Sequence, residues 1–160
     1  MAYAIARTDL MSGTKQPADL VSIKYQVSDV DAAIENGNFA LVGALDTDAH
    51  DVYLATTPAA NSAIEDVVLV ASPELMYDER KKNLNEFRNE AGEVARGYRL
   101  RSGNVYSVTA EALSGTPAVG SIVELQAGTK GNVVSTLTAG STKVGTIIAI
   151  EGSYVVIRIA

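Results

Sequence analysis

The chain offers few side chains that could carry out chemistry, and its single histidine is the first candidate. His50 lies in a polar stretch, Asp46-Thr-Asp48-Ala-His50-Asp51, where carboxylates and an imidazole come close together in sequence. A calcium loop of the EF-hand type needs glycine at its sixth position and glutamate at its twelfth, where this chain has Asp51 and Thr57. One histidine also leaves no second imidazole for the usual zinc sites. We interpret the stretch as a polar hairpin turn and predict no bound metal.

Other catalytic arrangements have equally little support. Cysteine is absent, which excludes disulfides, thiolate metal ligands and cysteine nucleophiles. The sequence contains no Gly-x-Ser-x-Gly elbow, and Gly128-Thr-Lys130-Gly131 lacks the spacing of a phosphate-binding loop. Carboxylates that are adjacent in sequence, such as Glu65 and Asp66, usually stay exposed to solvent. We therefore predict no catalytic residues, no cofactor and no enzymatic activity.

Charge is distributed unevenly along the chain, whose net charge is -6. Residues 1–80 carry 13 acidic and 4 basic side chains, whereas residues 81–160 carry 6 acidic and 9 basic ones. Seven basic side chains lie between Arg80 and Arg101. The negative total disfavours binding to nucleic acid or to anionic membranes. The basic segment fits either a solvated loop with local ion pairs or a contact patch for an acidic surface.

Short strands dominate the first half of the sequence. Leu20–Val27 alternates apolar and polar residues, which predicts an amphipathic strand with one buried face. Ser28–Glu35 could form a brief helix capped by Ser28, or equally a turn. Three further strands are predicted at Phe39–Leu45, Asp51–Thr56 and Asp66–Ala71.

Two segments lack a clear strand pattern. Residues 1–19 mix small and polar residues, with Pro17 interrupting any regular element, and are predicted to form an N-terminal arm. Residues 74–97 are highly charged and poor in strand-forming residues, so we predict a long loop-rich insertion. Because such a long connection is uncommon, we expect it to be functional or to cover the core.

The last third of the chain, residues 98–160, combines apolar strands with turns centred on glycine. Val119–Leu125 is echoed by Val144–Ile150, which suggests two equivalent strands of one barrel or sandwich. The final hairpin is apolar on both faces, so both faces must be covered by the rest of the sheet or by another subunit. The predicted hairpins pair Tyr98–Arg101 with Val105–Ala110 and fold Thr146–Ile159 about Glu151-Gly-Ser153.

The fold class predicted from these patterns is mainly β. We expect a single domain over residues 1–160, a compact β-barrel or sandwich of roughly 8–10 short strands with an N-terminal arm and one long loop-rich insertion. The start of the chain reaches Arg7 too soon for a signal peptide. Its longest purely apolar run, Val67–Ala71, is far shorter than a membrane span. We expect a soluble protein made in a cytoplasm.

One stretch of the chain resembles a known class of protein, and the likeness is densest from Val67 to Ala112. It is similar to the virion structural proteins of tailed bacteriophages, in particular the small head decoration proteins, which include capsid cement proteins and the bases of head fibres. The likeness rests on an overall pattern rather than on a chemically diagnostic motif. The residues that carry it are Val70-Ala-Ser-Pro-Glu74, Tyr77-Asp-Glu79, Asn85-Glu-Phe87, Asn89-Glu-Ala-Gly92, Ala95-Arg96, Tyr98-Arg-Leu100 and Gly103-Asn-Val-Tyr-Ser-Val-Thr109.

The resemblance implies a non-enzymatic, β-rich protein that binds the outer surface of a phage capsid. It implies the major capsid protein as a partner, self-association as a homotrimer, synthesis in the host bacterial cytoplasm and a final location on the virion exterior. Because no fibre shaft follows the last predicted strand, plain decoration is favoured over a fibre. The alternatives that stay open are another self-associating virion component, such as a head fibre or a tail protein, and a glycan-binding or hydrolytic β-module that uses the acidic loops.

If the protein binds a capsid, the basic segment and its aromatic neighbours are the predicted contact surface. Guanidinium groups suit bidentate pairing with carboxylates, and aromatic rings are common anchors of interfaces. The same surface could instead contact a sister subunit. The candidate residues are Arg80, Lys81, Lys82, Phe87, Arg88, Arg96, Tyr98 and Arg99.

Overall fold

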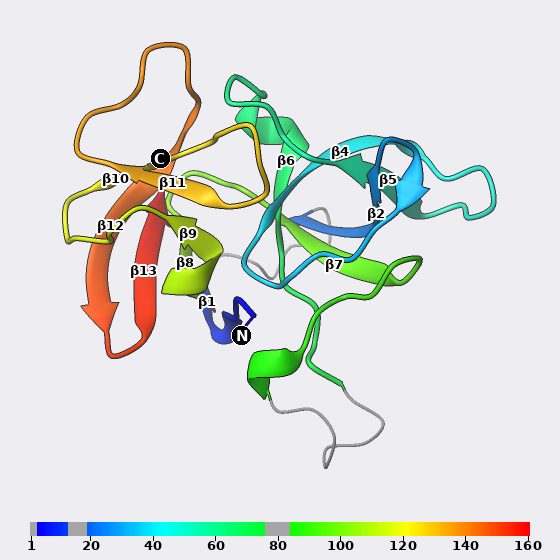
Figure 1. The fold of residues 1–160 in the computed structure, drawn as a ribbon, viewed down its shortest axis with the longest axis horizontal. Coiled ribbons are helices and arrows are strands. Elements are labelled where there is room, and N and C mark those ends of the chain that lie inside the picture. Colours follow the sequence, from blue (N-terminus) through cyan, green and yellow to red (C-terminus); the bar gives the residue numbers. More distant parts are fainter. Residues whose placement is uncertain (1–2, 13–18, 76–83) are drawn as a thin grey trace.

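The strands form two sheets that pack side by side (Figure 1). The structure is a computed structural model that describes residues 3–12, 19–75 and 84–160. Strands account for 47% of the structure and helices for 6%, which confirms the mainly β prediction. One sheet closes into a five-stranded barrel and the other is an open, curled sheet of seven strands.

The barrel is closed by hydrogen bonding between its first and last strands. Its strands follow the order β2-β5-β4-β6-β7, and β7 pairs with β2 to complete the circle. Strand β2 runs parallel to β5, and the other pairs are antiparallel. The two-residue β3 extends the sheet beside the end of β2. The bounds are β2 Leu20–Val27, β3 Val30–Asp31, β4 Phe39–Leu45, β5 Val52–Thr56, β6 Val67–Val70 and β7 Val94–Arg99.

The curled sheet contains both the start and the end of the chain. Its strand order is β1-β8-β13-β12-β10-β11-β9, and its pairs are antiparallel apart from β11 with β9. Three 3-10 turns lie wholly within the described residues, η2 Ile64–Asp66, η3 Leu84–Glu86 and η4 Ala110–Ala112, and no helix of the described residues is long and apolar enough to cross a membrane. The strands are β1 Ala6–Ser12, β8 Val105–Thr109, β9 Leu113–Ser114, β10 Ile122–Glu124, β11 Gly131–Val134, β12 Lys143–Glu151 and β13 Tyr154–Ile159.

Strand β6 joins the two halves, because it is buried on both faces. Val68 and Val70 belong to the cluster that fills the barrel, together with side chains of β2 such as Ile23. Val67 and Leu69 point the other way, into the cluster shared with the curled sheet. Successive side chains of a strand point to opposite faces, so a strand with a core on each side must be apolar throughout. The run of apolar residues at β6 therefore reflects two cores.

The predicted strands of the first half are largely confirmed. Leu20–Val27 and Phe39–Leu45 coincide with β2 and β4, and the other two predicted strands are one residue longer at one or both ends than β5 and β6. The helix proposed for Ser28–Glu35 is wrong, and the alternative turn is right. Ser28 and Asp29 have positive φ angles of 52° and 63°, which makes the tight turn of the β2–β3 hairpin.

Three predicted boundaries need correction. The N-terminal arm contains strand β1, which pairs with β8 through contacts such as Ala6 with Val108. The loop-rich insertion ends before Val94, because β7 begins there. Tyr98–Arg101 and Val105–Ala110 do not form a hairpin: β7 pairs with β2 and β6 in the barrel, whereas β8 pairs with β1 and β13 in the curled sheet. The turn between them is thus a crossing from one sheet to the other.

The other strands predicted for the C-terminal third of the chain are confirmed. The two echoed segments supply neighbouring antiparallel strands, β10 and β12, with Ile122 opposite Thr146. The last hairpin is confirmed as β12 and β13. Its core face is buried, but Ile148 and Ile150 on the other face remain 40% and 43% exposed in the part of the chain that the structure describes.

Candidate functional site: a groove beside strand β7

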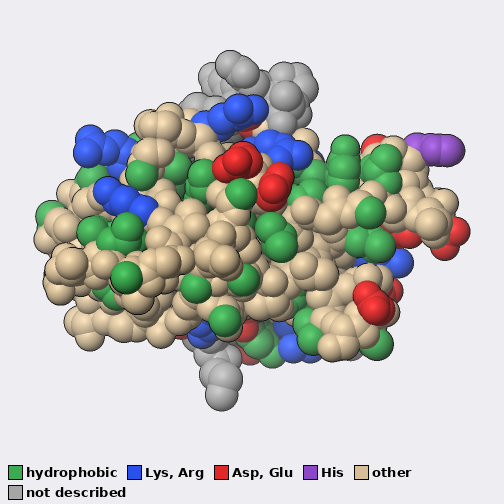
Figure 2. Space-filling view, turned by 90° about the horizontal axis from the view of Figure 1, so that it is seen from above, with side chains coloured by type: hydrophobic (Ala, Val, Ile, Leu, Met, Phe, Trp, Pro, Cys, Tyr) green, Lys and Arg blue, Asp and Glu red, His purple; other side chains and the backbone are tan. Residues whose placement is uncertain are grey.

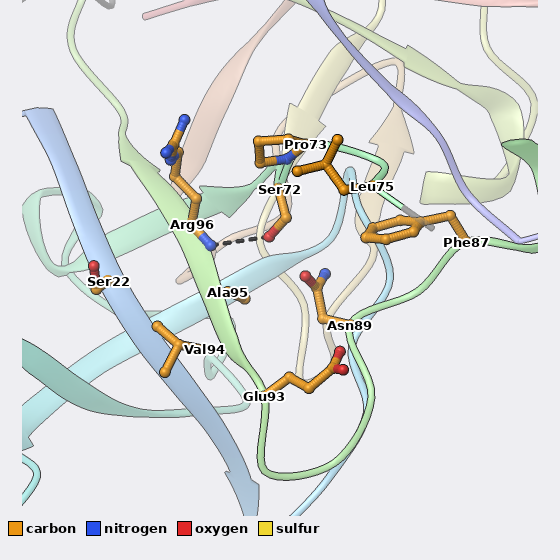
Figure 3. A pocket seen from close by; sticks show the side chains of 10 residues that line it. All are labelled: Ser22, Ser72, Pro73, Leu75, Phe87, Asn89, Glu93, Val94, Ala95 and Arg96. Carbon is orange, nitrogen blue, oxygen red and sulfur yellow. Dashed lines mark hydrogen bonds between the residues drawn. The ribbon is translucent and has the colours of Figure 1, made fainter. Parts of the chain in front are cut away.

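A groove of about 450 Å³ lies beside β7, and we call it the β7 groove (Figure 3). One side is formed by Val94–Arg96 of β7 and by Ser22, which faces outward from the neighbouring strand β2. The other side is formed by two groups of residues, one that follows β6 and one from the segment that leads into β7. They are Ser72, Pro73 and Leu75, and Phe87, Asn89 and Glu93. The groove thus lies where the long insertion leaves and rejoins the barrel.

A buried hydrogen-bond network holds the start of the insertion in place. The amide group of Asn36, whose side chain is buried, donates to the Ser72 carbonyl at 2.8 Å and accepts from the Ser72 backbone N–H at 2.9 Å. The Ser72 hydroxyl accepts a bond of 3.0 Å from the backbone N–H of Arg96. Buried polar groups that are fully bonded fix a single arrangement. The network therefore ties this side of the β7 groove to strand β7.

The end of the insertion is fixed in the same way. Asn89 and Ile34 exchange two backbone hydrogen bonds of 2.9 Å, which form an isolated bridge. The Asn89 side chain donates to the Ile34 carbonyl at 3.0 Å and to the Asn36 amide oxygen at 3.2 Å. Both ends of the insertion thus meet at Asn36, which gives the groove two defined walls.

The walls combine apolar surface with a positive charge. Leu75 is 83% exposed and Val94 is 56% exposed, while the ring of Phe87 is half-buried beside them. Arg96 is exposed and forms no ion pair with the described residues. In Figure 3 its guanidinium points away from Asn89 and Glu93. An apolar surface beside an available guanidinium can hold a partner that offers an apolar side chain and a carboxylate.

The structure brings two of the predicted contact residues, Phe87 and Arg96, into this groove. Arg88 forms an ion pair of 3.0 Å with Glu90 and lies over the ring of Tyr3, 5.4 Å from its centre. The hydrogen bond to Glu90 raises the pKa of Arg88 above its ordinary value, so the side chain stays charged. Arg88 is therefore engaged within the chain and is less available to a partner than Arg96.

Two other predicted residues lie away from the groove. Tyr98 is only 8% exposed and packs in the core shared by the two sheets, so its ring cannot act as a surface anchor. Arg99 is half-buried, and its guanidinium donates a 2.9 Å hydrogen bond to the Glu65 carbonyl. Arg80, Lys81 and Lys82 lie outside the described residues.

Sequence reasoning missed the apolar part of the groove, Leu75 and Val94. The exposure of Val94 could have been inferred from the alternation of strand β7. Ala95 points into the barrel, so its neighbour Val94 must point outward. An apolar residue at an outward position is informative when other exposed apolar side chains lie beside it. Leu75 had no such signal, because its position next to Phe87 depends on how the insertion folds back.

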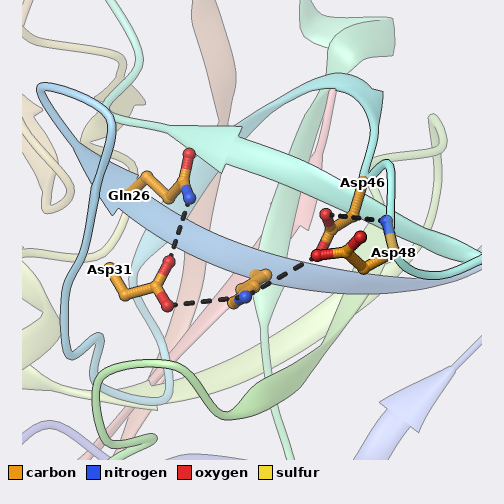
Figure 4. Close-up of polar contacts among 5 residues, drawn as sticks. Gln26, Asp31, Asp46 and Asp48 are labelled. Atoms are coloured by element: carbon orange, nitrogen blue, oxygen red, sulfur yellow. Dashed lines mark hydrogen bonds and ion pairs between the residues drawn. The ribbon is translucent and has the colours of Figure 1, made fainter.

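The acidic stretch around His50 is a polar turn between β4 and β5, as predicted. The carboxylate of Asp46 lies 3.7 Å from the Lys24 ammonium, which also lies 3.4 Å from Asp31 (Figure 4). A hydrogen bond from Gln26, followed by the charge of Lys24, lowers the pKa of Asp31. Within the described part of the chain, no group of three or more histidine or acidic side chains could hold a metal ion.

Charges of both signs meet on the molecular surface. Figure 2 shows one face, on which hydrophobic side chains form small separate groups and carboxylates lie next to basic side chains near the middle. Residues 19–75, which supply β2 to β6, carry ten carboxylates and a single basic side chain, Lys24. The basic groups of β7 therefore lie next to an acidic part of the chain. In comparisons with protein families, curated protein sequences and solved structures, none matches this chain.

Proposed function

We propose that this protein is a non-enzymatic decoration protein of a tailed-bacteriophage capsid, which binds the outer surface of the shell as a homotrimer and stabilises it. The β7 groove is its contact site for the major capsid protein. The proposal covers synthesis in the bacterial cytoplasm and a final place on the virion exterior.

The observation that carries the proposal is the overlap between the resemblance and the groove. The stretches that resemble head decoration proteins include Val70–Glu74, Asn85–Phe87, Asn89–Gly92 and Ala95–Arg96, and these stretches supply most of the groove. The stretches that carry the likeness thus supply Phe87 and Arg96 of the groove, and the exposed side chains of Leu75 and Val94 directly adjoin them in the sequence.

The chemistry of the groove suits a protein partner better than a small substrate. Phe87 and Leu75 provide apolar contact area, and Arg96 provides a guanidinium that can pair with a carboxylate in bidentate fashion. Each such contact is modest by itself. A trimer that engages several shell subunits at once gains effective concentration, and its overall binding becomes tight without any further contact.

The proposal is tested by co-sedimentation of the purified protein with undecorated shells of the phage that encodes it. We expect saturable binding at a fixed ratio to the shell protein, and light scattering should give a trimer in solution. A stable monomer that does not bind the shells would refute the proposal. Self-assembly without shell binding would favour the alternative of a head fibre or a tail component.

The groove is tested by two pairs of matched variants. Arg96→Glu and Val94→Asp should each weaken shell binding by roughly tenfold, which corresponds to the loss of an interface contact worth about 1.4 kcal/mol. Arg158→Glu, on β13, and Val119→Asp, in the turn before β10, make the same changes at exposed positions away from the groove and should leave binding unchanged. Equal effects of the two pairs would remove the β7 groove as the contact site.

A further inference from the structure

A second, smaller pocket lies where the chain leaves the barrel after β7. It has a volume of about 230 Å³ and is lined by Glu65, Arg99, Leu100 and Arg101. This is below the roughly 300–1,000 Å³ of a typical pocket for a drug-sized ligand. The pocket can hold a small group of atoms, such as one carboxylate, but not a large ligand.

The backbone places both arginines on the same side of the chain. Leu100 is 6% exposed and packs in the shared core. Side chains two positions apart in an extended segment point the same way, and the residue between them points the opposite way. Leu100 anchors the segment in the core, and the arginines on either side of it both line the pocket.

Each guanidinium is already held by one hydrogen bond. Arg99 donates from Nη1 to the Glu65 carbonyl at 2.9 Å, and Arg101 donates from Nε to Oδ1 of Asp19 at 2.6 Å. An arginine has five N–H donors, and among the described residues only one donor of each side chain has a partner. Side chains that are held in advance lose less conformational entropy when a ligand binds.

The charges of the pocket are not balanced by contact pairs. Asp19, which is 3% exposed, pairs with Arg101 and compensates its charge. Arg99 has no carboxylate within ion-pair distance among the described residues, and its bonding partner is a neutral carbonyl. Glu65 lines the same pocket without forming an ion pair to either arginine in the described structure. An anion that enters the pocket would therefore be attracted by the charge of Arg99 and repelled by the carboxylate of Glu65.

We propose that Arg99 and Arg101 form a binding site for a carboxylate group. Two planar guanidinium groups with free donors match the two oxygens of a carboxylate, which accept N–H bonds in the same plane. This site is distinct from the β7 groove, and the proposal does not depend on capsid binding. Glu65 limits the affinity of the site.

The site can be tested by NMR on the full-length, ¹⁵N-labelled protein, through the Nε–Hε signals of its arginines. Glutarate is titrated at constant ionic strength, with sodium chloride as the compensating salt and inorganic phosphate as a second probe. We expect saturable shifts of the Arg99 and Arg101 signals with glutarate, weaker binding of phosphate, and no saturable shift of Arg158, which is exposed on β13. Shifts that do not saturate, equal shifts at Arg158 or tighter binding of phosphate would each overturn the assignment to a carboxylate.

Three variants sharpen the test. Arg99→Gln should weaken glutarate binding at least roughly tenfold, as expected when a close charge pair is lost. Glu65→Gln should strengthen it roughly two- to fivefold, because a like charge is removed at a partly exposed site. Arg158→Gln, the matched control, should leave it unchanged, and backbone NMR spectra show whether each variant is folded. Unchanged binding by folded Glu65→Gln, or by folded Arg99→Gln, would contradict the proposal.

Discussion

The closed barrel and the curled sheet solve the same problem of burying a β-sheet in different ways. The barrel pairs β2 with β7, so its five strands leave no free edge, and its interior is filled by small and branched apolar side chains such as Ile23, Val68 and Ala95. The curled sheet is open at β1 and β9. It buries a carboxylate, Glu124, near its core.

The buried carboxylate of Glu124 connects a long loop of the curled sheet to one of its strands through hydrogen bonds. Glu124 is 2% exposed, and it accepts hydrogen bonds from Asn132 at 3.0 Å and from the backbone and hydroxyl of Thr138, both at 2.8 Å. Burial by itself favours the neutral acid, but the bonds from Thr138 and Asn132 outweigh it and lower the pKa of Glu124. The carboxylate therefore ties the loop after β11 to β10. The strands of the barrel are held by closure and packing. This part of the curled sheet depends instead on the hydrogen bonds of Glu124 with Asn132 and Thr138, which we call the polar clamp.

The largest effect should come from Gly145, at the centre of the curled sheet. A Cβ atom added there would collide with the backbone carbonyl of Arg158 on β13 and lie 3.0 Å from Ile157. Because backbone cannot move aside cheaply, Gly145→Ala should lower the free energy of unfolding by about 3 kcal/mol or more, measured by urea denaturation. Gly128→Ala is the control, since it meets only the flexible side chain of Gln126, and it should change stability by less than about 0.5 kcal/mol. Equal stabilities of the two variants would contradict the close approach of β12 and β13.

A smaller loss is expected when the polar clamp is broken. Glu124→Gln places an amide N–H₂ group next to the donors of Asn132 and Thr138. The substitution should lower the free energy of unfolding by about 2 kcal/mol at neutral pH, because a charge-assisted bond is lost and a buried donor is left unpaired. Glu151→Gln, on an exposed position of the same sheet, should cost almost nothing.

The clamp also predicts a pH dependence. A carboxylate whose pKa is lower in the folded state stabilises the fold fully above its unfolded pKa, about 4.3. This contribution is lost as the pH falls through the lowered folded pKa of Glu124. Urea denaturation between pH 7 and pH 3 should therefore show the difference between wild type and Glu124→Gln shrinking in acid. A constant difference would argue against an ionised Glu124.

The smallest of the three effects belongs to the barrel. A Cβ atom at Gly97 would lie 2.7 Å from Cγ2 of Val68, inside the barrel. A side chain can shift more easily than the backbone, so Gly97→Ala should lower the free energy of unfolding by only about 1 kcal/mol. The double variant with Val68→Ala should be less destabilised than the sum of the two single variants in a denaturation cycle. Full additivity would mean that these two residues do not compete for the same space.

Much of the strand pattern could be predicted because it depends on neighbouring residues in the sequence. Leu20–Val27 alternates as a strand with one buried face, and the turn residues of the last hairpin are flanked by apolar strands. The pairing of β7 and β8 could not be predicted in this way. A short turn between two strands favours a hairpin, but here each strand finds its partners in a different sheet.

The candidate site was predicted only in part. The predicted contact surface includes Phe87 and Arg96, and both line the β7 groove. Tyr98 was predicted to belong to the same surface, but it lies in the core. An aromatic residue next to arginines looks the same in sequence whether it faces solvent or a second sheet. Asn36 and Asn89 carried no local signal either, because their network joins residues separated by more than 50 positions.

Alternation, turn residues and composition act locally, so the β class, the absence of cysteine chemistry and most strand positions could be predicted from the order of the amino acids. Which strands close the barrel, which face of β6 meets which core, and which arginines bond within the described part of the chain became clear only from the three-dimensional fold. Those outcomes depend on contacts between distant parts of the chain, such as β2 with β7 and Arg99 with Glu65. Burial and pairing are properties of the assembled fold, and no single segment carries them.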